Sequence, residues 1–422
     1  MIQTQLKYGR SEIPFTYDPE RFAVLGHDSD APGLADIEVG NALDMPLGSP
    51  RIEDIVGTDE TVLIVVPDAT RRTAAGQIVN LLVRRLIAAG TLPFNISIIF
   101  ATGIHRAVTP QEKSEILTPF IFQRIKTLDH SARDLARTVR CGETSAGLPV
   151  ELNRALLEHD HIFTVGGIGF HYFAGFTGGR KLICPGLASA RTISATHRLA
   201  FDFDKKTRAE GCSPGRLAGN PVHEAFVEAA SKVNVAFSIN TIVNKAGEAA
   251  EIFCGDPIIA HEAACEHFAS TRTFAIGEKY DVVIADCGGF PYDINVIQAQ
   301  KSLDAAARLC KPNGTLILAA ECADGTGRDD LLKWFDAADS RELTDRLAEN
   351  YQVNGQTAWN ILRTAKSFDV RIITELDDAA CRKMRLTKFR SVTDSLADVA
   401  SDAKGAIIRS AAGHLFVNSG QE

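Results

Sequence analysis

The stretch that decides the fold is residues 61–72, TVLIVVPDATRR, in which a near-continuous apolar run leads directly into a polar turn. Residues 95–100 (NISIIF) and 161–165 (HIFTV) repeat the pattern. Such runs are typical of strands that are buried on both faces of a parallel sheet. An amphipathic segment at residues 78–86 and a helix start at Thr109 to Glu112 alternate with the runs and predict helices. The alternation predicts an α/β fold.

A second series of strands and helices begins near residue 274. Residues 280–285 (YDVVIA) and 315–319 (TLILA) predict two strands, and residues 296–310 predict a helix between them. The sequence therefore predicts an α/β protein of two domains with mainly parallel sheets, the second of them Rossmann-like.

The predicted domain boundary lies between residues 273 and 274. We assign residues 1–273, which open with a predicted β-hairpin, to the N-terminal domain, and residues 274–422 to the C-terminal domain. Short strands near residues 406–408 and 415–417 close the chain, and the sequence leaves open whether they pack back on the N-terminal domain.

Composition excludes several classes of protein. The 422 residues include 45 basic and 53 acidic side chains, a net charge of −8, and no run of Lys or Arg exceeds two, so we expect no nucleic-acid partner. No apolar stretch approaches the roughly 20 residues of a membrane span, and the N-terminus lacks a signal-peptide core, so we expect no membrane partner. Nine cysteines without a C-x-x-C pair suit a reducing compartment, which predicts a cytoplasmic protein.

Polar residues follow three of the predicted strands. In open α/β sheets ligands bind beyond the carboxyl ends of the strands. The first run is followed by Asp68 to Arg72, the second by His105, and the third by a glycine-rich segment that contains His171. A single histidine at a strand end is more often structural, but three polar ends together favour a ligand site.

The glycine-rich segment spans residues 166–197 and includes Gly178, Gly179 and Lys181. Lys181 does not complete a G-x-x-x-x-G-K-[ST] phosphate-binding loop, because the glycine spacing is wrong and leucine follows it. A lysine in a partly desolvated turn has a lowered pKa and is a candidate for covalent attachment of a cofactor. An ordinary phosphate-binding or surface lysine is the alternative.

Two histidine patterns raise the question of a metal. His159 and His161 form an H-x-H that zinc hydrolases use, but it lies at the start of a strand, away from the expected ligand end. His197 is a candidate ligand for a softer metal if something other than protein completes the coordination. The other helix histidines are predicted to lie on solvated faces: His223, His261 and His267.

Four segments of the chain match one family pattern in order. The first is D-x-T-R from Asp68, and the second is A-T-G-x-H-R ending at Arg106. The third is HYFAGFTGGRK from His171 to Lys181, followed by C-P-G and His197. The fourth is G-G-F-P-Y-D-I-N-x-x-Q-x-x-K from Gly288 to Lys301. The chain resembles the nickel-pincer-nucleotide lactate racemase family.

The resemblance implies a racemase or epimerase that inverts the α-carbon of a small-molecule 2-hydroxy acid, with its site in the cleft between the domains. The reaction implied is proton-coupled hydride transfer, with His105 and His171 as the acid/base pair. The cofactor implied is pyridinium-3,5-bisthiocarboxylic acid mononucleotide, a pincer that holds nickel. Lys181 would be its covalent tether and His197 the protein ligand to nickel. Cofactor-synthesis proteins would be partners in maturation.

The resemblance also assigns residues that bind the cofactor and the substrate. The remaining cofactor-binding candidates are Asp68, Thr70, Gly178 and Gly179, and the substrate-binding candidates are Arg71, Arg72, Gln298 and Lys301. Arg72 departs from the family pattern, which has proline at that position. A further guanidinium suggests a substrate with more oxygen or charge than lactate, unless Arg72 points to solvent or binds the cofactor phosphate.

Two other functions remain open at this point. An NAD-type 2-hydroxy acid dehydrogenase would need G-x-G-x-x-G with an acidic residue about 20 positions later, which the sequence lacks. A non-enzymatic carrier of nickel or its nucleotide would need Lys181 and His197 but not His105 and His171. The sequence contains all four of these residues, three histidines and one lysine, which favours the enzyme.

Overall fold

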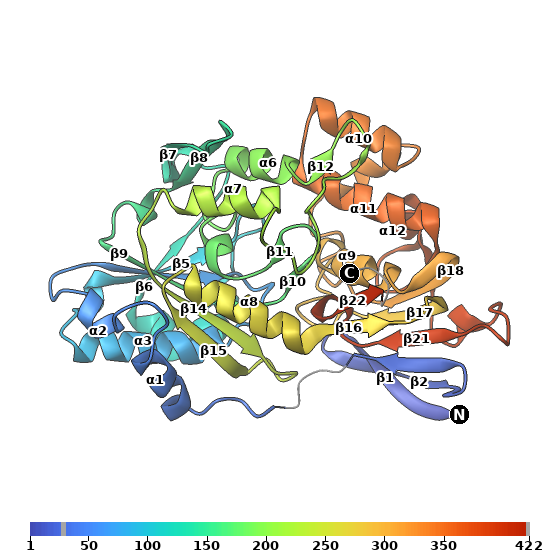
Figure 1. The fold of residues 1–422 in the computed structure, drawn as a ribbon, viewed down its shortest axis with the longest axis horizontal. Coiled ribbons are helices and arrows are strands. Elements are labelled where there is room, and N and C mark those ends of the chain that lie inside the picture. The colour runs from blue at the N-terminus through green and yellow to red at the C-terminus, as the bar shows by residue number, and fades with distance from the viewer. Residues whose placement is uncertain (27–30, 419–422) are drawn as a thin grey trace.

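Two six-stranded sheets organise the molecule. The computed structural model describes residues 1–26 and 31–418. Figure 1 shows the first sheet on the left and the second on the right, with helices around both. Nearly all strand pairs in the two sheets are parallel. The predicted α/β class with mainly parallel sheets is confirmed.

The first sheet contains the strands that the three apolar runs predict. Its order is β15 (Ala249–Gly255), β14 (Val235–Val243), β9 (His161–Gly167), β4 (Val62–Pro67), β5 (Ile96–Ala101) and β6 (Lys126–Asp129). Only β15 runs antiparallel to its neighbour. Every residue of β4 is buried, as expected for a central strand covered on both faces.

Helices cover this sheet, and two of them form where the amphipathic segment at residues 78–86 and the helix start at Thr109 predict them. The helices include α3 (Ala75–Ala88), α4 (Pro110–Leu117), α6 (Ala190–Arg198), α7 (Pro221–Ala230) and α8 (Ile259–Arg272). The start of α4 is a capping box, in which the Thr109 side chain accepts a hydrogen bond from the Glu112 amide and the Glu112 side chain accepts one from the Thr109 amide.

The second sheet is parallel throughout. Its order is β20 (Thr387–Phe389), β19 (Asp369–Ile373), β18 (Cys310–Ala319), β17 (Tyr280–Asp286), β21 (Gly405–Ile408) and β3 (Phe22–Leu25). Its helices are α9 (Val296–Ala307), α10 (Ser340–Glu349), α11 (Val353–Ser367) and α12 (Asp378–Lys383). The helix and two strands expected after residue 274 are therefore present.

The N-terminal residues differ from the domain assignment made from the sequence. The predicted hairpin forms as β1 (Ile2–Tyr8) and β2 (Ser11–Tyr17), but Leu6 and Phe15 pack into the core of the second sheet. β3 then adds an edge strand to that sheet by pairing with β21. Figure 1 shows this blue segment beneath the strands of the second half. The first 25 residues thus pack with the second sheet. The sequence does not predict this contact, because a four-residue edge strand carries no signal of its partner.

The last strands lie at the junction of the two halves. β21 completes the second sheet beside β17. β22 (Leu415–Asn418) pairs with β16 (Thr273–Ile276), and Leu415 packs against an apolar cluster that contains Phe170 and Phe268 of the N-terminal domain. One of the two closing strands therefore contacts both domains.

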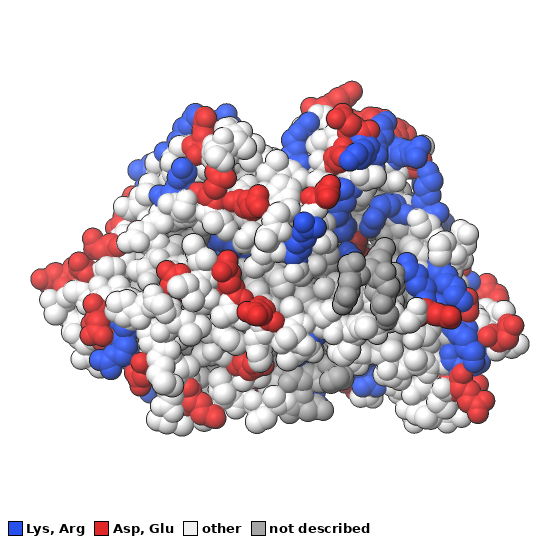
Figure 2. All heavy atoms as spheres, in the orientation of Figure 1, with Lys and Arg blue, Asp and Glu red and all other residues white. Residues whose placement is uncertain are grey.

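Smaller elements complete the fold. The remaining helices are α1 (Asp36–Asp44), α2 (Ile52–Ile55) and α5 (Pro119–Arg124), and the small hairpins are β7 (Thr138–Glu143) with β8 (Pro149–Asn153), β10 (Phe170–His171) with β11 (Gly175–Phe176), and β12 (Phe201–Asp202) with β13 (Thr207–Arg208). On the face in Figure 2, acidic and basic side chains are interspersed. Across the described parts of the chain, the helices are too short or too polar to cross a membrane.

Candidate active site

A cavity of about 350 Å³ brings the predicted site residues together from both domains. Its lining includes Asp68, Arg71, Arg72, His105, His171, Gly178, Lys181, His197, Gln298 and Lys301. Thr70 and Gly179 were predicted as cofactor-binding residues but do not line this cavity. The carboxyl ends of β4, β5 and β9 open onto it, as the rule for ligand sites in α/β sheets predicts.

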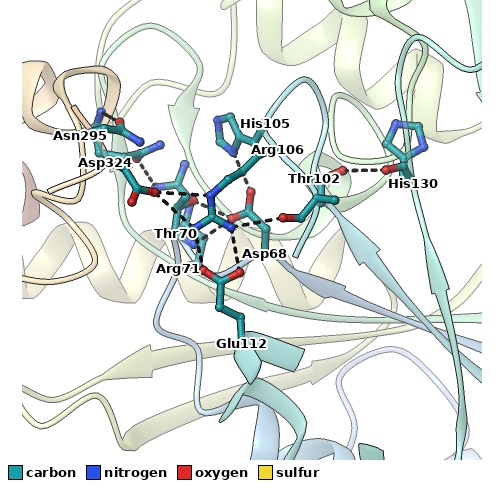
Figure 3. Close-up of polar contacts among 12 residues, drawn as sticks. Asp68, Thr70, Arg71, Thr102, His105, Arg106, Glu112, His130, Asn295 and Asp324 are labelled. Carbon is teal, nitrogen blue, oxygen red and sulfur yellow. Dashed lines mark hydrogen bonds and ion pairs between the residues drawn. The ribbon is translucent and has the colours of Figure 1, made fainter. Parts of the chain in front are cut away.

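Asp68 fixes the orientation of His105. Asp68 follows β4 directly, and its Oδ2 lies 2.6 Å from Nδ1 of His105, which follows the neighbouring strand β5 (Figure 3). Its Oδ1 accepts hydrogen bonds from the amide of Thr70 at 3.0 Å and from the Thr70 hydroxyl at 2.6 Å. Thr70 therefore acts on the site through Asp68.

The electrostatics of Asp68 keep it ionised. Burial alone would raise its pKa, but the contact with His105, the Thr70 hydrogen bond and the charge of Arg71 outweigh burial and lower the pKa from 3.8 to about 2. An ionised carboxylate only accepts hydrogen bonds, so Nδ1 of His105 carries the hydrogen. The lone pair of the neutral ring then lies on Nε2, where it can take up a proton.

His171 has the opposite arrangement of ring nitrogens. It lies in β10, stacked on Tyr172 with ring centroids 5.1 Å apart and edge-on to Phe173 at 4.6 Å. Its Nδ1 accepts a hydrogen bond from the Ala174 amide at 3.2 Å, so the hydrogen of the neutral ring lies on Nε2. Burial, followed by the charge of Lys181 and other nearby cations, holds the pKa of His171 well below its ordinary value. The cavity thus holds one imidazole that can accept a proton and one that can donate a hydrogen bond.

Lys181 and His197 lie together against two aromatic rings. The Nζ of Lys181 is 5.8 Å from the ring centroid of Phe173 and 5.5 Å from that of Phe226. The ring of His197, in the last turn of α6, contacts the same two side chains, at centroid distances of 5.3 and 5.4 Å. No hydrogen bond or ion pair to this Nζ is formed by the described residues.

Both groups have a lowered pKa in this environment. Burial and the charges of Arg180, Arg71 and Lys301 hold the pKa of Lys181 well below that of an ordinary lysine. Burial and the Lys181 charge lower the pKa of His197 to about 3. The buried Nδ1 of His197 has no hydrogen-bond partner within residues 1–26 and 31–418. A neutral amine can act as a nucleophile, and an unpartnered imidazole nitrogen can bind a metal.

The two glycines before Lys181 are required by the backbone. Gly178 and Gly179 have φ values of +77° and +50°, and a Cβ on Gly179 would lie 2.5 Å from the ring of His261. His261 is only 3% exposed and lies 2.9 Å from Arg180 Nη1, so the prediction that it occupies a solvated face is wrong. The missing side chain at Gly179 makes room for this histidine. Gly179 therefore shapes the turn that carries Lys181.

Two cations meet at one glutamine on the opposite wall. Gln298, near the start of α9, accepts hydrogen bonds through Oε1 from Arg71 Nη1 at 3.3 Å and from Lys301 Nζ at 2.6 Å. Burial and the charge of Arg71 hold the pKa of Lys301 well below its ordinary value. A carboxylate in the cavity would pair with both cations and relieve their mutual repulsion.

Arg72 crosses from the first domain to the second. Its Nη2 donates a 2.5 Å hydrogen bond to the carbonyl of Phe290, while the residue also lines the cavity. The bond holds the guanidinium between the two domains. Its effect on substrate choice stays a prediction.

Several cavity residues have no signal in the sequence. Lys7, Lys245, Arg272 and Arg328 come from segments far apart in the chain and lie outside the recognised motifs. With Arg71, Arg72, Lys181 and Lys301 they give the cavity eight basic side chains, against Asp68 as its one acidic side chain among the described residues. The cavity is therefore built for an anionic ligand.

Aromatic residues lie in the cavity wall, and the H-x-H pair lies outside it. Tyr172 and Phe173 both line the cavity, whereas Trp359 is a core residue that donates a hydrogen bond to Thr344. His159 contacts the Ala155 carbonyl and His161 contacts Glu60. In the described residues, no group of three or more His, Cys, Asp or Glu side chains could hold a metal ion.

The family models and the sequence relatives indicate the same family. The model of the lactate racemase N-terminal domain matches residues 8–209, and that of the lactate racemase C-terminal domain matches residues 277–411. The chain is 30% identical over 352 residues to lactate racemase from Thermoanaerobacterium thermosaccharolyticum, which covers 82% of this chain and 81% of the relative. It is 31% identical over 351 residues to lactate racemase from Lactiplantibacillus plantarum, with the same coverage of 82% and 81%.

Solved structures agree with the sequence relatives. The lactate racemase apoprotein from Thermoanaerobacterium thermosaccharolyticum superposes with a TM-score of 0.87 at 25% identity, over 99% of this chain and 100% of that chain. A protein from Thermotoga maritima shares the fold, with a TM-score of 0.74 at 19% identity over 93% of this chain and 100% of that one. Both family domains, in order and over most of the length, identify this chain as an enzyme that belongs to the lactate racemase family.

Proposed function

We propose that the protein is a racemase or epimerase that inverts the α-carbon of a 2-hydroxy acid. The observation that carries the proposal is the pair His105 and His171, which line one cavity with complementary ring nitrogens. Inversion requires groups that can serve both faces of the α-carbon, and imidazoles suit proton transfer in both directions.

The substrate carboxylate would bind to Arg71 and Lys301, with Gln298 between them. Arginine can bind a carboxylate through two parallel hydrogen bonds, and Lys301 adds a second positive charge. This anchor would hold the acid in place while its hydroxyl-bearing carbon presents first one face and then the other. The excess of basic side chains around the cavity favours entry of an anion.

His105 would take the hydroxyl proton at Nε2, because Asp68 holds its Nδ1 hydrogen. The ionised Asp68 would stabilise the imidazolium that results. On the other face His171 would serve the same hydroxyl oxygen. Binding of an anion beside Lys181, Lys301 and Arg71 would offset the charges that lower the pKa of His171, so that this ring could also carry a proton in the complex.

The residues of the cavity fit a nickel-pincer nucleotide. Lys181 offers an amine with a lowered pKa and, among the described residues, no hydrogen-bond or ion-pair partner, which suits a covalent tether. The buried Nδ1 of His197 has no hydrogen-bond partner among the described residues, and the lowered pKa favours the neutral ring. This ring would supply one nickel ligand, and the pincer would supply the remaining ligands. When bound, this cofactor would supply a pyridinium ring that accepts and returns the α-hydrogen as hydride.

Maturation would take place with other proteins. We infer that cofactor-synthesis proteins load the chain, since neither the nucleotide nor its thiocarboxylate arms can come from the chain itself. The nine cysteines are all free thiols, which favours a cytoplasmic location.

Co-expression with the cofactor-synthesis proteins tests the function. Without added NAD, the loaded protein should convert each enantiomer of a 2-hydroxy acid into the other. Chiral chromatography measures this conversion. Net oxidation that depends on NAD would favour the dehydrogenase. Loading without inversion of any acid in a broad panel would favour the carrier.

A further inference from the structure

Tyr172 connects the ring of His171 to the second domain. The two rings are stacked, with centroids 5.1 Å apart and planes inclined by 26°. The side chain of Tyr172 lies beside Gln300 of α9 and Thr357 of α11, and both of these residues line the cavity with His171. The residue on which His171 stacks therefore contacts both domains.

The main chain of Tyr172 is held by Arg208. Arg208 lies in β13, the second strand of the hairpin that follows α6, and its Nη1 donates a 2.9 Å hydrogen bond to the Tyr172 carbonyl. Through Nη2 the same guanidinium donates to Asp304 Oδ1 of α9 at 2.9 Å and to Asn360 Oδ1 of α11 at 3.1 Å. One planar group thus joins the residue after His171 to two helices of the second domain.

Asp304 is a buried carboxylate with cations around it. Its exposed fraction is 3%, and it is contacted by Arg208 at 2.9 Å, by Arg363 at 3.1 Å and by Arg308 at 3.5 Å. Burial alone would raise the pKa of Asp304, but the three arginines outweigh burial and lower it. The carboxylate therefore stays ionised. Because a buried charge that loses its partner is costly, the contact closely defines the position of Arg208.

Asp304 stands on the same helix as the proposed substrate anchor. α9 carries Gln298 and Lys301, and Asp304 follows Lys301 by three residues. The helix therefore bears the carboxylate anchor near its start and the acceptor of Arg208 about one turn further on. The path from α9 through Arg208 to Tyr172 sets the distance between this anchor and His171, although the anchor and the histidine lie in different domains.

The hairpin that carries Arg208 is itself seated on the second domain. Phe201 of β12 packs edge-on against Trp359 of α11 at a centroid distance of 4.9 Å, and Lys206 pairs with Asp345 of α10 at 2.6 Å. Figure 1 shows β12 beside α10 and α11. The hairpin is therefore a bridge between the domains, and Arg208 extends this bridge to the cavity wall.

We propose that Arg208 is a positioning residue for the reaction, which acts through Tyr172 to hold His171 at a fixed place relative to the anchor on α9. The inference rests on the proposed function and adds a residue to it. Proton transfer depends on the distance and direction between the two partners, so inversion needs a constant separation of His171 from the bound acid. Arg208 provides it because its two amino groups bond to opposite sides of the cleft.

The first test separates kcat from KM in the cofactor-loaded enzyme, with the 2-hydroxy acid that the wild type inverts fastest. Arg208→Met should lower kcat about tenfold or more in both directions, because His171 is misplaced. KM should change less than about threefold, since the carboxylate anchor keeps all its residues. A residue that only held the domains together would instead raise KM, because Gln298 and Lys301 lie across the cleft from both histidines. An unchanged kcat, or a rise in KM alone, would overturn the proposal.

Two control variants remove neighbouring contacts and leave Tyr172 in place. Arg363→Met takes another arginine from the same carboxylate, and Arg363 bonds to Asp304 and Asn360 rather than to Tyr172. Lys206→Met removes another ion pair between the domains from the same hairpin. Neither variant should lower kcat more than about twofold. A loss in either control equal to that in Arg208→Met would overturn the positioning role.

Arg208→Lys keeps the proposal testable if the methionine variant does not fold. Lysine retains a positive charge beside Asp304, but its single ammonium lacks the two separate nitrogens that reach the Tyr172 carbonyl and the carboxylate. The thermal unfolding temperature should stay close to that of the wild type, while kcat falls about fivefold or more. A wild-type kcat in this variant would overturn the proposal.

A histidine NMR signal tests the link from Arg208 to His171 without the cofactor. In full-length protein labelled with ¹³C at histidine Cε1, the His171 signal is assigned by its loss in His171→Gln. It should shift in both Arg208 variants and stay in place in Lys206→Met, because the ring stacked on it moves only in the former. A shift in protein that inverts no acid would support the link and count against the racemase. An unmoved signal would overturn the positioning role, whatever the activity.

Discussion

Asp68 Oδ2 lies 2.6 Å from Nδ1 of His105, so a carboxylate at the end of one strand sets the tautomer of an imidazole that follows the next strand. The parallel arrangement of β4 and β5 places both carboxyl ends at the same edge of the sheet. The contact therefore follows from the topology, and it determines which nitrogen of His105 is available to a ligand.

Replacing Asp68 by Asn should lower kcat about 100-fold or more while His105 remains in place. The amide can donate to Nδ1 and so favour the wrong tautomer, which removes the general base. Rates in both directions with the cofactor loaded would measure the loss, and ring ¹⁵N shifts would report the tautomer. Glu60→Gln is a matched control, since Glu60 contacts His161 at 2.6 Å away from the cavity. A normal rate in the Asp68 variant would contradict this role.

The stability contribution of Asp68 should depend on pH. Its folded pKa of about 2 lies below the ordinary value of 3.8, so ionisation of Asp68 stabilises the fold above pH 4 by about 2 kcal/mol. This contribution is lost as the pH falls from about 4 to about 2. Urea unfolding of the wild type and of Asp68→Asn at pH 6, 4 and 3 should show the difference in unfolding free energy shrinking at the lowest pH. A constant difference would rule the linkage out.

Removing either His105 or His171 should abolish inversion in both directions. Each ring serves one face of the α-carbon, and an inversion uses both faces, so either Ala variant should lose about 100-fold or more. Chiral chromatography from each enantiomer provides the measurement. His159→Ala, outside the cavity, should retain normal rates. Near-normal inversion by one of the cavity variants would show that this histidine is not part of the pair.

Loss of Lys181 and loss of His197 should differ in kind. Lys181→Ala should lack the cofactor-sized mass increase on the intact protein, because the tethering amine is gone. His197→Ala should keep the adduct but bind nickel more weakly, because alanine supplies no ligand. Intact-protein mass spectrometry and metal analysis distinguish the two, with the exposed Lys205→Ala as control. An adduct on Lys181→Ala, or full nickel content in His197→Ala, would instead favour the carrier or the dehydrogenase function.

Arg72→Ala should reduce kcat/KM for longer, more oxygenated acids by more than it does for lactate. A hydrogen bond to a charged group contributes enough free energy to change the relative kcat/KM of two acids about tenfold. The bond from Arg72 to the Phe290 carbonyl suggests a second effect, a common rise in KM for all acids through weaker contact between the domains. An equal loss across the acid panel would assign Arg72 to domain contact alone.

Much of the first domain could be predicted from local sequence. Strands such as β4 are buried along their whole length, so their apolar runs are unbroken, and the capping box at Thr109 marks a helix start by itself. The histidines and Lys181 stood in recognisable motifs at the ends of those strands. Proximity of these motifs then follows from parallel strand order.

The rest depended on contacts between distant segments. β3 has four residues with Ala23 and Val24 exposed, so its pattern does not show that it belongs to a sheet formed by the other end of the chain. His261 could not be recognised as buried, because the space for its ring is created by the absent side chain of Gly179. Arg328 reaches the cavity from a loop whose position is set by packing on Asn295.

The pairing of β3 with β21 has a consequence for synthesis of the protein. Arg21, just before β3, donates a hydrogen bond to the carbonyl of Ala403, 382 residues further along the chain. During synthesis, β3 emerges long before β21, so this edge of the second sheet can close only after residues 405–408 have been made. A nascent chain usually folds its leading domain first, but β3 emerges early and cannot pair until β21 has been made. Late, slow closure of this edge of the second sheet is the behaviour to expect during translation.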